Sequence, residues 1–484
     1  MLIFMKTLSK SEERDIDTIH KFSVQNLWFQ QIPAYILSSI APLIVGIVNV
    51  SLLPRIMGSQ TYGVYALVII TSNMVASVAG EWLLPSGIRL ASDTRGNQIW
   101  NTLGWISFFC TLIAIIIVGM LLIKQSISIS VWVAALFYTV TMVVSKPFIA
   151  YIRFSLQRKL VAGYALFSSL GSLIFGFGLY IIFKSLGWFI AGLSIIPFIT
   201  FITYCLKFKC FLKRPELTAW KSILRFGLPI VITSIGGQLL QFVDRYMLAL
   251  FKAYTDVGIY NIAYNLSDKL LGVGFSILFS SMYPVGTRVW SAGNQIEAKI
   301  LLTNLFSFLG LFAGAFLWFQ SVSGVSVIRW MAGNEFMPPS LIPMVVTLGS
   351  WLWYTGIIQH QPFEWDKRTI WITAMTLLSA ILNLVLNWVL IPLWGMTGAA
   401  IATLISYAFY LTLCTLIGRI YYKVRVWRLR IVLGASLSAL ILWYLFRGNG
   451  LLWQGLLAAF LYVILYIALV GSKLFVNVLR TKLT

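Results

Sequence analysis

Charged residues are scarce in this chain of 484 residues: Asp, Glu, Lys and Arg make up 10% of it, against 59% for hydrophobic residues. A soluble globular chain has about 25% charged and 45–50% apolar residues, so this sequence falls outside the soluble class. Acids are the scarcest, since 14 stand against 36 bases and leave a net charge of +22. The bases recur between apolar runs instead of forming one patch, which excludes a nucleic-acid enzyme and a nucleic-acid partner.

Residues that build metal and disulfide sites are also few. The chain has two histidines and four cysteines, with no C-x-x-C motif and no Cys/His ligand spacing. The cysteines lie in or beside apolar runs, so we expect core residues and no metal, cofactor or disulfide. The first thirty residues are polar and mix both signs of charge, so we expect no cleavable signal peptide.

Long apolar runs fill the rest of the chain, and the mean hydropathy is +0.88. A membrane-spanning helix needs about 20 mostly apolar residues. We therefore predict an all-α polytopic membrane protein with about 14 transmembrane helices. The predicted spans are 32–53, 62–84, 102–123, 129–151, 161–183, 187–206, 226–250, 257–285, 300–319, 340–361, 369–391, 395–417, 431–446 and 451–470.

The joins between these spans alternate in their number of Lys and Arg residues. Of the 36 bases, 27 lie in the two ends and in every second join, six lie in the other joins and three lie inside spans. Because basic joins remain in the cytoplasm, we predict both termini there. The longest joins, 207–225 inside and 320–339 outside, are too short for a catalytic domain, so we expect the protein to act within the bilayer.

The two halves of the chain contain similar short motifs in the same order. Tyr62-Gly63-Val64-Tyr65 at the second span matches Val257-Gly258-Ile259-Tyr260 at the eighth, and Pro147-Phe148 with a following basic pair recurs at Pro362-Phe363. The order predicts a duplicated six-helix unit plus two terminal helices. An even number of spans makes the copies parallel, and transporters of this kind bind cargo between halves that rock for alternating access.

The repeat predicts six segments along the chain. They are a cytoplasmic N-terminal segment 1–31, an N-lobe 32–206, a basic cytoplasmic linker 207–225, a C-lobe 226–417, a basic cytoplasmic loop 418–430, and two last spans with a cytoplasmic tail over 431–484.

Three segments of the sequence carry a resemblance to a known family. "LLPRIMGSQTYGVYAL", "FGLPIVITSIGGQLLQFVDRYMLALFKAYTDVGIYNIAY" and "IPLWGMTGAAIATLISYAF" resemble the polysaccharide transporter family, the Wzx-type flippase branch of the multidrug/oligosaccharidyl-lipid/polysaccharide (MOP) superfamily. The resemblance covers nearly the whole chain. It implies a MATE-like, pseudo-two-fold, V-shaped pair of six-helix lobes.

The resemblance also implies a function, which is that of a flippase and not of an enzyme. The cargo would be a polyprenyl-pyrophosphate-linked oligosaccharide repeat unit for O-antigen, capsule or exopolysaccharide. It would move from the inner to the outer leaflet of a bacterial cytoplasmic (inner) membrane. The implied partners are this cargo, membrane lipids, and the polysaccharide polymerase and chain-length machinery.

Charged side chains inside predicted spans are functional candidates, because each costs about 2.5–3.5 kcal/mol on insertion. Arg245, Lys269 and Lys146 are candidate partners of the pyrophosphate, since Arg and Lys both bind phosphate. The three carboxylates are candidates for coupling to a gradient of H⁺ or Na⁺. They are Glu81, Asp244 and Asp268.

Amides line the same helices as these charges. Gln238, Gln241 and Arg245 share one face of the seventh span at steps of three and four residues. In the eighth span, Asn261 and Asn265 precede Asp268 and Lys269 at helical spacing. Amides donate and accept the hydrogen bonds that sugars need, so we predict that both faces line a central cavity and bind cargo.

Other interpretations of these residues remain open. An alternative interpretation is that Asp244/Arg245 and Asp268/Lys269 only neutralise each other across the helix pair. Glu81 and Lys146 lie near inner ends of spans, where an interfacial position explains them equally well. Gly236-Gly237 permits either a bend or close helix packing.

Three rival functions follow from the same chemistry. A MATE-like drug or cation antiporter would bind cations through acidic cavity residues, whereas the first span here, 32–53, holds no acid. A lipid II-type peptidoglycan precursor flippase would concentrate Arg in the first two spans. A polytopic glycosyltransferase or polymerase would need a substantial outer loop with catalytic residues.

Overall fold

The computed structural model describes residues 24–91, 96–123, 127–154, 158–208, 215–423 and 429–471. Within these ranges the chain is helical almost throughout and has no strand. Ten helices of the described ranges are long and apolar enough to cross a membrane, or eleven when a bent pair is counted as one span. The predicted all-α, multi-pass membrane fold is therefore confirmed.

Each of the fourteen predicted spans lies on one helix or on consecutive helices. The first half contains α2 (Val24–Gly80), α3 (Leu83–Ala91), α4 (Gly96–Ile123), α5 (Ile129–Val144), α6 (Lys146–Phe154), α7 (Arg158–Phe183), α8 (Leu186–Leu193) and α9 (Ile195–Phe208). The second half contains α10 (Leu217–Phe251), α11 (Tyr254–Tyr264), the π-helix η1 (Asn265–Lys269), α12 (Leu270–Ser291), α13 (Gln295–Ala332), the 3-10 helix η2 (Asn334–Phe336), α14 (Ile342–Trp365), α15 (Thr369–Tyr422), α16 (Leu429–Phe446), α17 (Leu452–Tyr466) and the π-helix η3 (Ile467–Gly471).

Two of these helices, α2 and α15, each contain two predicted spans. Gly58 divides α2 with φ 74° and ψ 168°, and Gly395 divides α15 with φ 55° and ψ −131°. Only glycine adopts such positive φ values without steric cost. Both glycines lie in the sequence segments that carry the resemblance to the polysaccharide transporter family.

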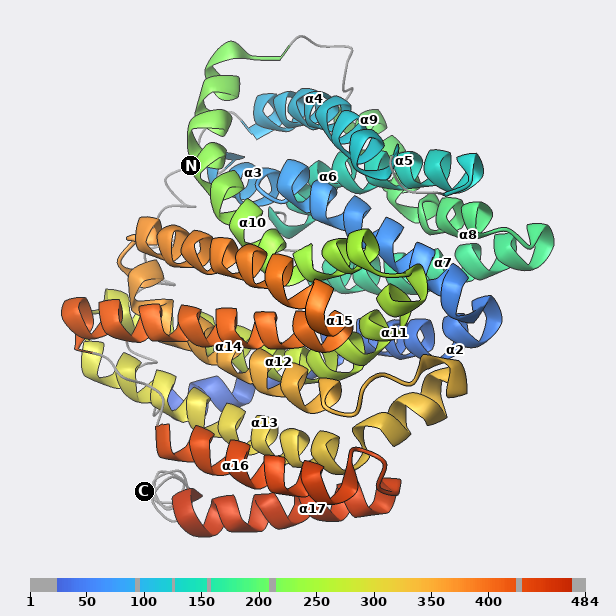
Figure 1. The fold of residues 1–484 in the computed structure, drawn as a ribbon. Helices are drawn as coiled ribbons and strands as arrows, with labels where there is room; N and C mark the ends of the chain where they lie inside the picture. Colours follow the sequence, from blue (N-terminus) through green and yellow to red (C-terminus); the bar gives the residue numbers. More distant parts are fainter. Residues whose placement is uncertain are drawn as a thin grey trace.

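The helices form two groups, which we call the first lobe (α3–α9) and the second lobe (α12–α15). In Figure 1 the first lobe lies above the second, and α2 and α10 each contact helices of both lobes. Near the turn at Gly58, Arg55 Nε of α2 donates to the carbonyl of Met331 in α13 over 2.9 Å. Asn261 in α11 donates to the Tyr62 hydroxyl in α2 over 3.4 Å. The two groups, with two further helices, agree with the predicted MATE-like architecture.

The two last helices, α16 and α17, lie at the lower edge of the molecule and pack on α13 (Figure 1). Tyr466 donates to the Ser307 carbonyl over 2.8 Å, and the Trp318 indole donates to Ser438 over 3.1 Å. Lipid offers no hydrogen bonds, so such polar contacts hold apolar helices together. These helices contribute no residue to the site described below.

The structure corrects the predicted joins. Residues 320–339 are mostly helix, since α13 continues to Ala332 and buries Gln320 and Ser321. Within the predicted linker 207–225, α10 begins at Leu217. Residues 1–23, 209–214, 424–428 and 472–484 lie outside the described residues.

Candidate functional site

Asp244 and Arg245 form an enclosed ion pair on α10, which we call the sealed pair. Their side chains are 2% and 1% exposed, and Arg245 Nη1 lies 3.0 Å from Asp244 Oδ1. The other carboxylate oxygen accepts hydrogen bonds from Tyr260 over 2.9 Å and from Thr403 over 3.4 Å. The donors come from α11 and α15, so the sealed pair lies inside the packing between α10 and the second lobe.

Aromatic rings complete the enclosure of Arg245. Its guanidinium lies 3.8 Å from the centre of the Tyr264 ring, a cation–π distance. Tyr264 in turn shares a hydrogen bond of 3.1 Å with Tyr407 of α15. Arg245 Nε is buried without a hydrogen-bond partner among the described residues. The charge of Arg245 is therefore neutralised by Asp244 and further stabilised by aromatic rings, and its side chain does not face an open cavity in this structure.

Asp268 and Lys269 occupy a different environment, which we call the open pair. They end η1, a single π-helical turn between α11 and α12. Such turns insert a residue into a helix and are frequent at functional sites. The half-buried Asp268 accepts hydrogen bonds from Ser350 over 2.7 Å and Tyr354 over 3.1 Å, both on α14. Lys269 is exposed, and no carboxylate of the described residues lies within ion-pair distance of its ammonium.

Lys269 lines a pocket of about 420 Å³, which we call the lysine pocket. Asn265 and Asp268 line it from η1, Tyr354 lines it from α14, and Ile47 lines it from α2. The pocket thus lies where α2 meets the helices of the second lobe. It combines one cation, an amide, a carboxylate and a phenol with apolar walls, a set that suits an anionic, hydroxyl-rich ligand with an apolar part.

The other predicted amides do not gather in the lysine pocket. Asn261 is buried against Tyr62, and Gln241 is half-buried with its carbonyl accepting from Arg245. Gln238 lines a second, apolar pocket between α2, α4 and α10. The α10 helix is continuous through Gly236-Gly237, and a Cβ atom at Gly236 would lie 3.0 Å from Leu377, which agrees with close packing.

Glu81 and Lys146 form an ion pair with each other. Glu81 ends the α2 segment and Lys146 opens α6, and their side chains are 47% and 16% exposed. An exposed pair of this kind lies outside both the lysine pocket and the sealed pair. In the second lobe, Gln361 and Tyr283 donate to Glu364 over 3.2 and 2.8 Å.

Sequence reasoning missed the groups that hold the carboxylates in place. Ser350, Thr403 and Glu364 were not singled out. Hydroxyl residues are common in membrane helices, so their type carries little signal without the packing. The described residues contain no group of three or more His, Cys, Asp or Glu side chains that could hold a metal ion.

The arrangement is that of a two-lobed membrane transporter, and comparisons with known proteins agree. Residues 29–290, more than half of the chain, match the sequence profile of the family described as polysaccharide biosynthesis protein. The chain therefore belongs to this family, which confirms the predicted polysaccharide transporter of the MOP superfamily.

Among curated proteins, the chain is similar to the probable low-salt glycan biosynthesis flippase Agl15 of Haloferax volcanii. The two are 25% identical over 208 residues, which span 42% of this chain and 43% of the relative. The similarity thus covers less than half of either protein.

Solved structures share the fold at low sequence identity. The lipid II flippase MurJ in an inward closed conformation has a TM-score of 0.72 at 15% identity, covering 91% of this chain and all of the other. A MOP superfamily transporter from Pyrococcus furiosus gives 0.59 at 12% identity, over 82% of this chain and 95% of that one. An inward-facing multidrug resistance MATE transporter gives 0.56 at 13% identity, over 81% and 97%. These likenesses establish the fold alone.

Proposed function

We propose that the protein is a flippase for polyprenyl-pyrophosphate-linked oligosaccharide repeat units of a surface polysaccharide. It moves the cargo from the inner to the outer leaflet of a bacterial cytoplasmic membrane by alternating access between its lobes, with both termini in the cytoplasm. Family membership and the glycan flippase among its relatives support the proposal. The polymerase and chain-length machinery would receive the flipped unit.

The observation that carries the proposal is the exposed Lys269 in the lysine pocket. A pyrophosphate keeps its negative charge during passage and needs a cation that is not already used by a protein carboxylate. Asp268 Oδ1 accepts hydrogen bonds from the Ser350 and Tyr354 hydroxyls and none from Lys269 among the described contacts. The ammonium is therefore available to a ligand, and Asn265 beside it can hydrogen-bond a sugar.

The experiment measures transport in vesicles that hold the purified full-length protein and a fluorescent lipid-linked oligosaccharide. We expect Lys269→Ala and the double variant Lys269→Ala/Asp268→Ala to lose flipping alike, because the cargo phosphate loses its partner in both. Lys252→Ala, which removes an exposed base at the far end of α10, serves as the matched control. Normal transport by the double variant would remove Lys269 from the site.

The same vesicles separate the rival functions. Lipid II as cargo tests a peptidoglycan precursor flippase, which the shared MurJ fold makes the natural second candidate. Formation of new glycosidic bonds would instead establish an enzyme. Preference for lipid II over every oligosaccharide carrier, or any bond formation, overturns the proposal.

We also propose that an ion gradient drives the transport and that Asp268 is the coupling carboxylate. Of the three predicted candidates it alone lines the lysine pocket, whereas Asp244 is enclosed and Glu81 is paired with Lys146. Collapsing the proton gradient and the Na⁺ gradient separately should stop transport in one case only. Transport that persists without both gradients contradicts coupling.

A further inference from the structure

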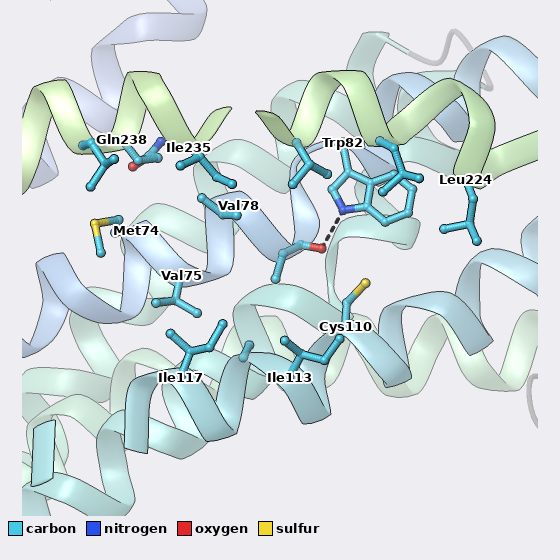
Figure 2. A pocket seen from close by; sticks show the side chains of 15 residues that line it. Met74, Val75, Val78, Trp82, Cys110, Ile113, Ile117, Leu224, Ile235 and Gln238 are labelled. Carbon is cyan, nitrogen blue, oxygen red and sulfur yellow. Dashed lines mark hydrogen bonds between the residues drawn. The ribbon is translucent and has the colours of Figure 1, made fainter. Parts of the chain in front are cut away.

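The second pocket is an apolar groove of about 480 Å³ between α2, α4 and α10. Figure 2 shows Val78, Ile113, Ile117 and Ile235 converging on it from these three helices. Ile113 is 58% exposed, so the groove is open along its side. In a membrane protein such an opening faces lipid chains.

The sequence of α10 builds one wall of the groove. Leu224, Leu228, Val231 and Ile235 recur at steps of four, three and four residues, which puts them on one helical face. The helix bends by 45° between its Leu217–Arg225 and Ile230–Phe251 parts.

Trp82 lines the groove near the bend. A Cβ atom at position 227 would lie 2.0 Å from the Trp82 ring, so Gly227 is what lets the indole pack there. The indole N–H is satisfied by the Ala79 carbonyl over 2.9 Å, shown as the dashed line in Figure 2. The indole therefore adds a large apolar surface to the wall of the groove, with no free polar group.

Two bases continue the same face of α10 beyond the groove. Lys221 and Arg225 are exposed, and each precedes a groove residue by three positions, a rise of about 4.5 Å. Of the acids of this region, Glu81 pairs with Lys146, and Glu216 accepts a hydrogen bond from Thr218 over 2.6 Å. The groove thus has an apolar body and a cationic end, which complements a lipid with one anionic head.

We propose that the groove holds the polyprenyl chain of the cargo, with its phosphates against Lys221 and Arg225 while the cargo awaits flipping. The inference rests on the proposed function, because it names the part of that cargo which the lysine pocket does not hold. The groove is lined by branched Val, Leu and Ile side chains, which suit an apolar lipid chain, and the two bases beyond it suit the anionic phosphates at the head of that chain.

The test uses a polyprenyl pyrophosphate that carries a diazirine in its chain. It is mixed with the full-length protein in vesicles of phosphatidylethanolamine and phosphatidylglycerol, and the labelled residues are mapped after irradiation. We expect label on the groove faces of α4 and α10, with Ile113→Trp reducing it more than about fivefold, since the ring fills the opening. Ile116→Trp is the matched control: Ile116 is 55% exposed on the same helix and does not line the groove.

The cationic end is tested with Lys221→Ala and Arg225→Ala. Each should weaken labelling by about fivefold, the effect of one base near an anionic lipid. Arg430→Ala, at the start of the peripheral α16, should leave it unchanged. These variants alter exposed residues, so loss of folding does not confound the result.

Two outcomes overturn the inference. One is label as strong at residue 116 as at residue 113, which means bulk lipid contact only. The other is competition by phosphatidylglycerol as effective as by unlabelled polyprenyl pyrophosphate, which identifies a resident phospholipid. Either outcome, found while the vesicles still flip the lipid-linked oligosaccharide, refutes the groove and leaves the proposed function intact. Groove labelling without any flipping supports the groove and refutes the function.

Discussion

The sealed pair and the open pair have the same composition, an aspartate followed by a base, and nearly opposite environments. Asp244 and Arg245 bind each other and are at most 2% exposed. Asp268 turns away to Ser350 and Tyr354, and leaves Lys269 exposed in the lysine pocket. A charged side chain inside a membrane protein is thus stabilised in one of two ways: by an opposite charge of the protein, or by water in an accessible cavity.

The comparison predicts that the sealed pair matters for the stability of the fold and the cation of the open pair for transport. Removing one member of a buried pair leaves an uncompensated charge, which destabilises the fold strongly. Removing the cation of the open pair leaves the protein's own hydrogen bonds intact, so its loss should appear in transport. The following variants test this division, beginning with the largest effect on stability.

Asp244→Asn should destabilise the protein by about 3–5 kcal/mol, because the enclosed Arg245 loses its counter-charge. Asp268→Asn should cost at most half of that, since an amide oxygen still accepts from Ser350 and Tyr354. The measurement is the thermal unfolding midpoint in detergent together with the amount of protein in the membrane.

A paired replacement checks the reason for the first result. Asp244→Leu/Arg245→Met removes both charges at once and should recover most of the lost stability, because apolar side chains can replace a buried ion pair. Equal midpoints for Asp244→Asn and Asp268→Asn would contradict the division between the pairs.

The hydroxyl donors to Asp268 should have an intermediate effect. Ser350→Ala and Tyr354→Phe each remove one hydrogen bond to a carboxylate, worth about 1.5–3 kcal/mol. The 2.7 Å bond from Ser350 is shorter than the 3.1 Å bond from Tyr354, so Ser350→Ala should lower the unfolding midpoint more. The Asp268→Asn background is the control, since both losses should shrink there; undiminished losses would mean that the hydroxyls act through packing alone.

The Glu81–Lys146 pair should matter least. Its carboxylate is 47% exposed, and exposed ion pairs contribute about 0–1 kcal/mol. We expect Glu81→Gln and Glu81→Gln/Lys146→Met to unfold within a few degrees of the unchanged protein. A fall in midpoint as large as that of Asp244→Asn would show that this pair holds the inner ends of α2 and α6 together.

Much of the fold was predictable from local sequence. The apolar runs placed all fourteen spans, because hydrocarbon forces each segment to satisfy its own backbone. The segment 320–339 was predicted as a join between spans. The structure extends α13 to Ala332, since Gln320 and the serines near it find partners inside the protein.

The candidate site was predictable in type and not in arrangement. Helical spacing put Gln241 and Arg245 on one face, and the structure shows the Arg245 guanidinium donating to the backbone carbonyl of Gln241. Spacing also put Asn261 and Lys269 near one face, but the π-helical turn η1 shifts the phase between them. Asn261 consequently meets Tyr62, whereas Lys269 enters the lysine pocket.

By itself, the sequence determined that this is an all-α membrane protein, and that six charges inside its spans need an explanation. Hydropathy, glycine turns and charge counts are properties of short local segments, so the sequence shows them without any knowledge of how the segments pack. The tertiary structure decided which charged side chains pair with other groups of the protein and which remain accessible to a ligand. Arg245 and Lys269 are both cations beside an aspartate, and only the helices packed around each of them enclose the first with Tyr264 and leave the second exposed.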